Sequence, residues 1–313
     1  MIYQAMRPQT LSAMRGNKAM IASLNALLKK KEHPHVYLFV GGTGCGKTTS
    51  ARIMAKEFGA APSDIIEMNA ADRTGVDDAR SLAEFARMRP LSGGNRAVII
   101  DEAALLSRNA QSALLKELED VPRYQYYFLC STDPQKILPT IKNRCACYEV
   151  KPLDNNEIYD LLDEAIKRFK LGDRYLEEQA DKLMSRIVEF ADGCPRAALQ
   201  ALEQVVGIEN FDEAMNAILH MDVAAESRDV ARAVVKKQEW AKVAALLVAM
   251  KSDNAGAESA RRAMLGYFRS CLLKAPDPIK QKRYAKMVEI FSADLFASGE
   301  PGLVGMTWRA LNV

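Results

Sequence analysis

The sequence predicts an α/β nucleotide-binding domain followed by a helical half. Three observations support this prediction. A glycine-rich loop, Gly41–Thr48, separates an apolar run from a helical pattern. Short apolar runs alternate with helical patterns as far as Val150, which is typical of a mostly parallel sheet with helices on both faces. After Pro152 only helical patterns occur.

The first elements of the chain surround the glycine-rich loop. An amphipathic helix is expected over Asn17–Lys31, and a buried strand over Val36–Val40. The loop then reads Gly-Gly-Thr-Gly-Cys-Gly-Lys-Thr and precedes a helix expected over Thr49–Phe58. This spacing defines a phosphate-binding loop, whose backbone N–H groups and helix N-terminus attract phosphate oxygens. Lys47 is expected to reach the β- and γ-phosphates, and Thr48 to ligate Mg²⁺.

The remaining strands of the first half are short and apolar. They are expected at residues 65–68, 97–100, 126–130 and 146–150, with helices at 77–88 and 107–118 between them. The strand at 97–100 delivers Asp101 and Glu102 at its end. An acid at this position is the Walker B carboxylate that ligates Mg²⁺, and Glu102 can polarise the attacking water.

Composition excludes several classes of protein. The chain has 313 residues, 49% hydrophobic content and a net charge of +3, which argues against constitutive, charge-driven coating of nucleic acid. No apolar run is long enough to cross a bilayer, and no export signal is expected. The six cysteines form no CxxC pair and are typical of reduced thiols. A cytoplasmic protein without membrane attachment is therefore expected.

The motifs occur in the order and spacing of AAA+ clamp-loader ATPase subunits, and the sequence resembles that family over about residues 1–206. The segment Leu106–Lys116 resembles the bacterial tau/gamma and replication factor C small subunits, and Asn69–Asp77 resembles the replication factor C form. Four further segments carry the resemblance: Gly41–Thr48, Ile99–Glu102, Ser131–Lys136 and Asn143–Cys145. Gly193–Leu199 resembles the sensor 2 segment.

The resemblance implies three domains. Residues 1–152 would form an AAA+ domain with a mostly parallel five-stranded sheet. Residues 153–221 would form a small helical lid domain, and residues 222–313 an all-helical collar that seals the oligomer. Stand-alone packing of a helical bundle explains the apolar positions of the last segment equally well.

The resemblance also implies roles for individual residues. Thr132 would be sensor 1, Arg144 an arginine finger acting in a neighbour's site, and Arg196 sensor 2, in addition to the catalytic Lys47 and Glu102. With Mg²⁺ held by Thr48 and Asp101, the ATP-binding residues would be Arg7, Pro8, Gly42, Thr43, Gly44, Cys45, Gly46, Lys47, Thr48, Thr49 and Arg196. Met14–Gly16 would also lie near the adenine.

The sequence departs from the family pattern at three places. Ala103 and Ala104 follow the Walker B acids, and Asn143 replaces the usual serine before Arg144. No cysteine lies between Lys47 and Asp101, so the zinc module of the bacterial tau/gamma subunit is absent. This absence favours the replication factor C or phage type of small subunit.

The family's partners set further expectations: other subunits in a pentamer, a sliding clamp and primer-template DNA. The candidate DNA contacts are Arg80, Arg87, Arg108 and Lys116. A solvated surface position explains Arg80 and Arg108 equally well, and it explains Arg87 and Lys116 better than DNA contact does. The segment Ala86–Leu91 would touch the clamp, or else pack on its own sheet. The protein would act in the cytoplasm, of a host if phage-encoded, in association with the nucleoid.

Two other functions remain open from the sequence. One is a different AAA+ DNA-processing ATPase, such as a branch-migration motor or a helicase loader. The other is an assembly subunit without catalytic activity. The presence together of Lys47, Thr48, Asp101, Glu102 and Arg144 argues against the second.

Overall fold

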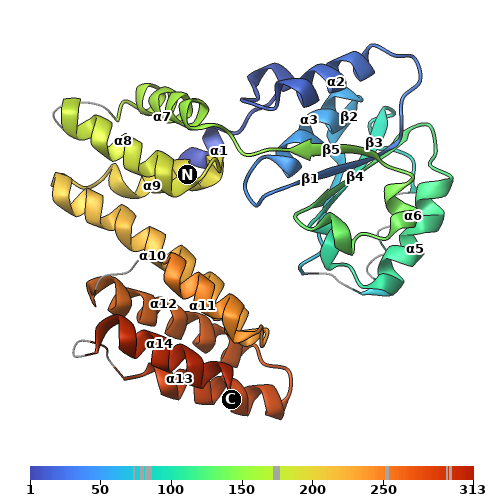
Figure 1. Cartoon of the computed structure of the whole chain (residues 1–313). Coiled ribbons are helices and arrows are strands. Elements are labelled where there is room, and N and C mark those ends of the chain that lie inside the picture. The colour runs from blue at the N-terminus through green and yellow to red at the C-terminus, as the bar shows by residue number, and fades with distance from the viewer. Residues whose placement is uncertain are drawn as a thin grey trace. The chain divides into compact units, whose positions relative to one another are not determined.

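The computed structural model describes residues 1–72, 75–77, 81, 87–171, 177–250, 254–293, 295 and 298–313. The chain divides into two compact units, Met1–Val206 and Gly207–Val313. The first unit holds the sheet together with helices α1 to α3 and α5 to α9, and the second holds α10 to α14 (Figure 1).

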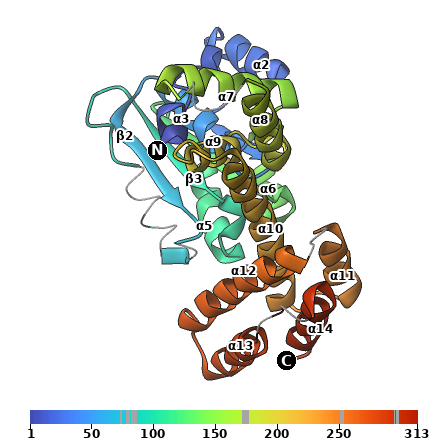
Figure 2. The ribbon, with the colours of Figure 1, turned by 90° about the vertical axis from the view of Figure 1, so that its left-hand side faces the viewer.

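The sheet of the first unit has five strands in the order β2-β3-β4-β1-β5, and neighbouring strands pair in parallel. Figure 2 shows β2 at one edge with β3 beside it. The strands span Val36–Gly41 (β1), Ala60–Asn69 (β2), Asn95–Asp101 (β3), Gln125–Ser131 (β4) and Ala146–Val150 (β5). The predicted sheet, its parallel direction and its five strands are confirmed.

Helices cover both faces of this sheet. Helices α2 (Lys18–Leu28) and α3 (Lys47–Glu57) pack on one face, where Leu24 and Met54 are fully buried. Helices α5 (Arg108–Glu119) and α6 (Pro139–Lys142) pack on the other. Strand β4 lies between β3 and β1 and is buried at every residue, which explains its continuous apolar run.

Strand β2 is longer than predicted. It begins at Ala60 and has an irregular register between Ala60 and Ile65, so it includes the polar residue Asp64. The carboxylate of Asp64 is buried and accepts hydrogen bonds from the N–H groups of Leu91 and Ser92 and from the Ser92 hydroxyl, at 2.6–3.0 Å. The predicted helix over 77–88 lies mostly outside the described residues.

The helical part of the first unit comprises α1 (Ile2–Ala5), α7 (Asn155–Phe169), α8 (Glu177–Ala191) and α9 (Pro195–Val205). Helix α7 starts with a capping box, in which Asp154 and Glu157 each accept from the other's backbone N–H. Helix α1 packs on α9, and the backbone N–H of Ile2 donates to Glu203 at 3.2 Å. These contacts place the N-terminal segment beside the predicted lid helices.

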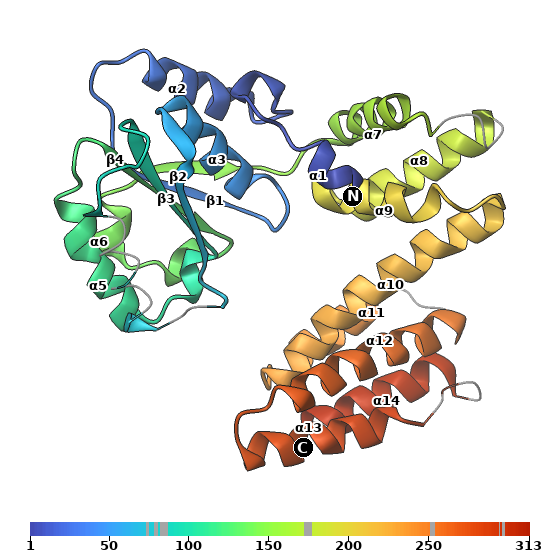
Figure 3. The same ribbon diagram turned by 180° about the vertical axis from the view of Figure 1, so that it is seen from behind.

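The second unit is a helical bundle with its own apolar core, visible in Figures 2 and 3. Its helices span Phe211–Val235 (α10), Trp240–Ala249 (α11), Asn254–Leu273 (α12), Pro278–Phe291 (α13) and Gly299–Leu311 (α14). Helix α10 runs without a break through its 25 residues, because neither glycine nor proline interrupts it. The residue expected to end the lid domain, 221, lies within α10, and the two compact units divide between residues 206 and 207.

Short 3₁₀ segments complete the described fold, at Leu11–Ala13, Ala103–Leu105 and Pro134–Lys136. Among the described residues, no helix is both long enough and apolar enough to span a bilayer.

Candidate nucleotide-binding site

The phosphate-binding loop connects β1 to α3, as the sequence predicts. Helix α3 begins at Lys47, directly after Gly46, whose φ of 110° is in the left-handed region that glycine adopts readily. Gly44 also has a positive φ, of 76°. A Cβ at Gly44 would lie 2.4 Å from the Cys194 sulfur, so a side chain there would displace the start of α9. The glycines thus allow the loop to curve and allow α9 to pack closely against it.

Lys47 is buried beneath this loop. Its side chain turns back, and Nζ donates to the carbonyl oxygens of Gly41 and Gly42 at 3.1 and 2.9 Å. These bonds satisfy part of the ammonium's donor capacity in a position with little solvent. The lysine is therefore held in the loop, next to the space that phosphates would occupy.

Thr48 and Asp101 meet at the carboxyl ends of the strands. The Thr48 hydroxyl donates to Asp101 Oδ2 at 2.9 Å, and both residues line the same cavity. A hydroxyl and a carboxylate are hard oxygen donors of the kind that Mg²⁺ prefers. This pair fits the predicted metal site.

Glu102 and Thr132 form a second polar pair. Strands β3 and β4 are neighbours, so the residues that follow them come together, and Thr132 Oγ1 donates to Glu102 Oε2 at 2.9 Å. Glu102 has a φ of 50°, an uncommon conformation for a residue with a side chain. The predicted sensor 1 residue therefore contacts the predicted water-polarising carboxylate directly.

The start of α9 packs on the phosphate-binding loop. Cys194, which precedes α9, donates from Sγ to the Thr43 carbonyl at 3.4 Å. Arg196 follows in the first turn and is exposed, with its Cβ 3.3 Å from the position that a Cβ at Gly44 would take. The predicted sensor 2 arginine thus lies beside the loop.

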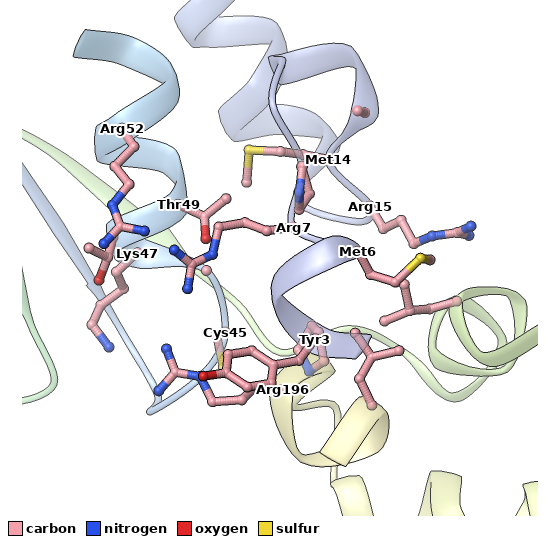
Figure 4. Close-up of a pocket in the computed structure, with 18 of the residues that line it drawn as sticks. Tyr3, Met6, Arg7, Met14, Arg15, Cys45, Lys47, Thr49, Arg52 and Arg196 are labelled. Atoms are coloured by element: carbon pink, nitrogen blue, oxygen red, sulfur yellow. The ribbon is translucent and has the colours of Figure 1, made fainter. Parts of the chain in front are cut away.

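A cavity of about 470 Å³ joins these groups. Figure 4 shows the guanidinium groups of Arg7, Arg52 and Arg196 directed toward the space beside the loop, whereas Arg15 points away toward α7. The predicted residues on the cavity wall are Arg7, Pro8, Met14, Arg15, Thr43, Gly44, Cys45, Gly46, Lys47, Thr48, Thr49, Asp101, Glu102 and Arg196. Gly42 and Thr132 are not on the wall but bond to Lys47 and Glu102, which are.

Several cavity residues were not predicted. Tyr3 and Met6 come from α1 and its C-terminal end, for which the sequence gives no clear signal. Glu164 and Arg168 lie four residues apart on α7, so their spacing on one helix face could have identified them. Arg52 and Glu67 form an ion pair in the wall, and Arg52 lies one helical turn beyond Thr48.

The cysteine in the loop adds no charge to the site. Burial is the main cause that raises the pKa of the Cys45 thiol, and the neighbouring Cys194 raises it further. Cys45 therefore stays a neutral thiol at physiological pH, which is compatible with an anionic ligand nearby.

Arg144 lies away from this cavity. Its guanidinium forms an ion pair with Glu119 on α5 and donates to the Thr140 carbonyl at 2.8 Å. It does not line its own chain's cavity.

The four candidate DNA contacts differ in their surroundings. Arg108 and Lys116 are exposed on α5. The Arg87 guanidinium is bound by Glu117 through two hydrogen bonds, of 2.8 and 2.5 Å. Arg80 lies outside the described residues. In the segment predicted to meet the clamp, Ala86 is likewise not described, but Met88 is 56% and Leu91 83% exposed, so these two do not pack on the sheet.

The parallel sheet, the phosphate-binding loop and the paired Walker B acids together define an AAA+ P-loop fold. Solved structures of the Thermotoga maritima RuvB Holliday junction branch migration motor share it. One matches with a TM-score of 0.55 at 18% identity and covers 74% of this chain and 79% of that one. A point variant of RuvB gives a TM-score of 0.56 at 16% identity, covering 85% and 92%. At such identities the likeness concerns the fold.

Sequence similarity indicates which kind of AAA+ protein this chain resembles. The chain is 32% identical to DNA polymerase III subunit tau of Escherichia coli over 282 residues, which are 78% of this chain and 43% of that protein. It is 31% identical to subunit tau/gamma of Haemophilus influenzae, covering 69% and 33%. A family model described as DNA polymerase III, delta subunit, matches residues 60–154. The predicted resemblance to AAA+ clamp-loader subunits is thus confirmed, and it is of the bacterial tau/gamma type.

The relatives differ from this chain in length, and they also show which type of clamp-loader subunit it resembles. The chain spans about a third to two fifths of the length of these two relatives. The absence of cysteine between Lys47 and Asp101 had favoured the replication factor C or phage type, whereas these relatives are tau and tau/gamma subunits. That absence is therefore a poor guide to type, since a loop segment can be lost without changing the fold around it.

Proposed function

We propose that this protein is an ATP-hydrolysing subunit of a sliding-clamp loader, which opens a clamp and places it at primer-template junctions during DNA replication. The observation that supports this most directly is the cavity lined by the phosphate-binding loop, Asp101, Glu102 and Arg196. Similarity to DNA polymerase III tau/gamma subunits favours clamp loading among the uses of an AAA+ ATPase.

The residues have separable roles in this proposal. Lys47 exchanges its bonds with Gly41 and Gly42 for bonds to the β- and γ-phosphates. Thr48 and Asp101 would hold Mg²⁺, which neutralises phosphate charge when bound. Glu102 orients the attacking water, and Thr132 fixes the Glu102 carboxylate. Arg196 adds positive charge from the lid side.

Arg144 would act in the site of the next subunit. Its position outside its own cavity supports this role, as does an ion pair with Glu119 that can open at a subunit contact. The other partners in the proposal are the clamp, met by the exposed Met88 and Leu91, and DNA, met by Arg108 and Lys116. Arg87 is less suited to DNA, because Glu117 already binds it.

The test is ATP turnover by the complex assembled from this chain and the products of its genomic neighbours. We expect clamp and primed DNA together to raise the rate well above that of the complex alone. An equal rate with and without both would reject clamp loading. Complexes built only from Arg144→Ala chains or only from Lys47→Ala chains should be inactive. When the two variants are mixed, activity should return at those contacts where the intact Arg144 of one subunit faces the intact phosphate-binding loop of the next.

A second candidate is a branch-migration motor, which the fold likeness to RuvB favours. Its support is weaker, because identities of 16–18% indicate the fold alone. Native mass measurement separates the two: a pentamer is expected for a clamp loader and a hexamer for the motor. A helicase loader is a further AAA+ alternative that the same measurement addresses.

A further inference from the structure

An ion pair in the cavity wall lies beside the proposed metal ligands. Arg52 donates to Glu67 through two parallel hydrogen bonds, Nε to Oε2 at 2.8 Å and Nη2 to Oε1 at 2.6 Å. Both side chains are about one-third exposed, at 34% and 33%. This fork arrangement fixes the guanidinium plane more firmly than a single bond would.

Arg52 also lies near the Walker B carboxylate. On α3 it is four residues beyond Thr48, so the two share a helix face. Asn69 pairs with Asp101 in the sheet, and Glu67 precedes Asn69 by two residues, so Glu67 and Asp101 both face α3. The hydrogen bonds that Arg52 donates to Glu67 are the main cause that raises the pKa of Arg52, and the charge of Asp101 adds to it. The guanidinium thus bonds to the Glu67 carboxylate and also experiences the charge of Asp101.

We propose that Glu67 is a positioning residue for the metal site: by binding Arg52 it keeps the guanidinium away from Asp101, which stays available to Thr48 and Mg²⁺. This inference rests on the proposed nucleotide-binding function. Without Glu67, the Asp101 carboxylate, whose charge already acts on Arg52, is open to pairing with it, because Arg–carboxylate pairs form readily in fork geometry. An unpaired guanidinium also repels a divalent cation. Both effects would raise the Mg²⁺ concentration that the site requires.

The experiment measures equilibrium binding of a fluorescent ATP analogue to the full chain over a Mg²⁺ titration. For Glu67→Gln we expect the Mg²⁺ midpoint to rise about tenfold. In the double variant Glu67→Gln with Arg52→Met, both charges are gone, and the midpoint should return to within about twofold of wild type. Arg52→Met alone should lower it severalfold, because Glu67 is then unopposed near the cation.

Glu57→Gln is the matched control, since Glu57 is an exposed residue at the end of the same helix. Its midpoint should equal that of wild type. A double variant as impaired as Glu67→Gln overturns the inference, because Glu67 would then act on the metal by itself. If Glu67→Gln fails to fold, the Arg52→Met variant provides the test. A Mg²⁺ midpoint that is higher in Arg52→Met than in wild type overturns the inference.

Crystal structures of the nucleotide-free wild type and Glu67→Gln provide a readout that needs no ATP. We expect the Arg52 guanidinium of the variant on Asp101 and the Thr48–Asp101 hydrogen bond lost. A guanidinium that stays away from Asp101 overturns the inference. A wild-type chain that binds no analogue at any Mg²⁺ concentration rejects the proposed function instead, and the two structures still decide the role of Glu67.

Discussion

At the scale of single residues, the site is built from side chains that already hold one another. Lys47 bonds to its own loop, Thr48 to Asp101 and Thr132 to Glu102. The last two bonds join segments that are distant in the sequence. Such mutual support is how a fold limits the rotamers of catalytic groups before a ligand arrives.

Lys47→Ala should abolish ATP hydrolysis, because no other described lysine lines the cavity. We expect turnover to fall at least a hundredfold, measured as phosphate release. Lys29→Ala, which changes an exposed lysine just after α2, serves as the control and should keep wild-type turnover. Unchanged turnover in Lys47→Ala would point to a contaminating ATPase and reject the site.

Thr132→Val should lower hydrolysis while sparing nucleotide binding. The valine has a similar shape but cannot donate to Glu102, so the carboxylate loses the bond that fixes it. A loss of about tenfold to a hundredfold is expected in single-turnover rate, with analogue affinity unchanged. Thr132→Ser retains the hydroxyl and should recover most of the rate; equal losses in both variants would mean that the hydroxyl is not the cause.

At the scale of elements, buried carboxylates link separate segments of the chain through hydrogen bonds. Asp64 on β2 binds the turn before β3 through Leu91 and Ser92, and also accepts from Arg96. Glu258 on α12 accepts from Arg261, Arg262 and the backbone of Leu295, which follows α13. In both cases an ionised acid joins parts of the chain that apolar packing alone would not align.

Asp64 should make stability fall in acid. The hydrogen bond from the Ser92 hydroxyl is the main cause that lowers the pKa of Asp64, from 3.8 to about 2, with help from the backbone of Leu91 and Ser92. Its stabilising effect is therefore complete above pH 3.8 and is lost as the pH falls through about 2. In urea titrations, Asp64→Asn should unfold earlier than wild type at pH 6, and the difference should shrink below pH 3.

Asp160→Asn, at an exposed position on α7, is the control for that series and should follow the wild-type pH dependence. A gap between wild type and Asp64→Asn that stays constant from pH 6 to pH 2 would mean that the ionised carboxylate is not what stabilises the turn.

Glu258→Gln should destabilise the second unit. Arg261 is buried and donates two hydrogen bonds to this carboxylate, at 2.8 and 2.6 Å, so the variant leaves a buried guanidinium without its counter-charge. The expected cost is about 3 kcal/mol of unfolding free energy. Differential scanning calorimetry should show the change in the transition of the second unit. Glu289→Gln, an exposed residue on α13, should leave that transition in place.

At the scale of the whole molecule, the second compact unit has an apolar core of its own. The core of the second unit is formed by α10 to α14, and Met264, Phe268 and Phe291 are fully buried within it. A core of this kind meets the physical requirement for independent folding.

The fragment 207–313 should therefore fold alone. We expect helical circular dichroism and one cooperative thermal transition. A fragment that melts without cooperativity would show that the bundle depends on the rest of the chain. The fragment 1–206 should keep Mg²⁺-dependent nucleotide binding, because every residue that lines the cavity belongs to it.

The sequence predicts the local parts of this molecule better than its long-range parts. The strands, the loop and the Walker B acids follow from apolar runs and fixed spacings, and the structure places them as expected. The extension of β2 could not be predicted, because it depends on Asp64 meeting Leu91 and Ser92 from a distant segment. The continuity of α10 could have been predicted, since neither glycine nor proline occurs between Phe211 and Val235.

The same distinction holds for the site. Lys47, Thr48 and Asp101 belong to motifs in which chemistry and spacing go together. Tyr3, Met6 and Arg168 come from segments without a motif, and only the packing of α1 against α9 and of α7 near the loop brings them to the cavity. Glu67 could be predicted only in part. Its partner Arg52 is on a predicted helix, but the sequence does not show that this helix residue contacts Glu67 on a strand.

The close approach of Gly44 to Cys194 and Arg196 also bears on how the sequence can change over time. A side chain at position 44 would collide with the sulfur of residue 194, so the two positions cannot drift independently. A lineage that replaces this glycine would have to reduce residue 194 or move the start of α9. These two positions, distant in the sequence, are therefore expected to vary as a pair among descendants of this chain.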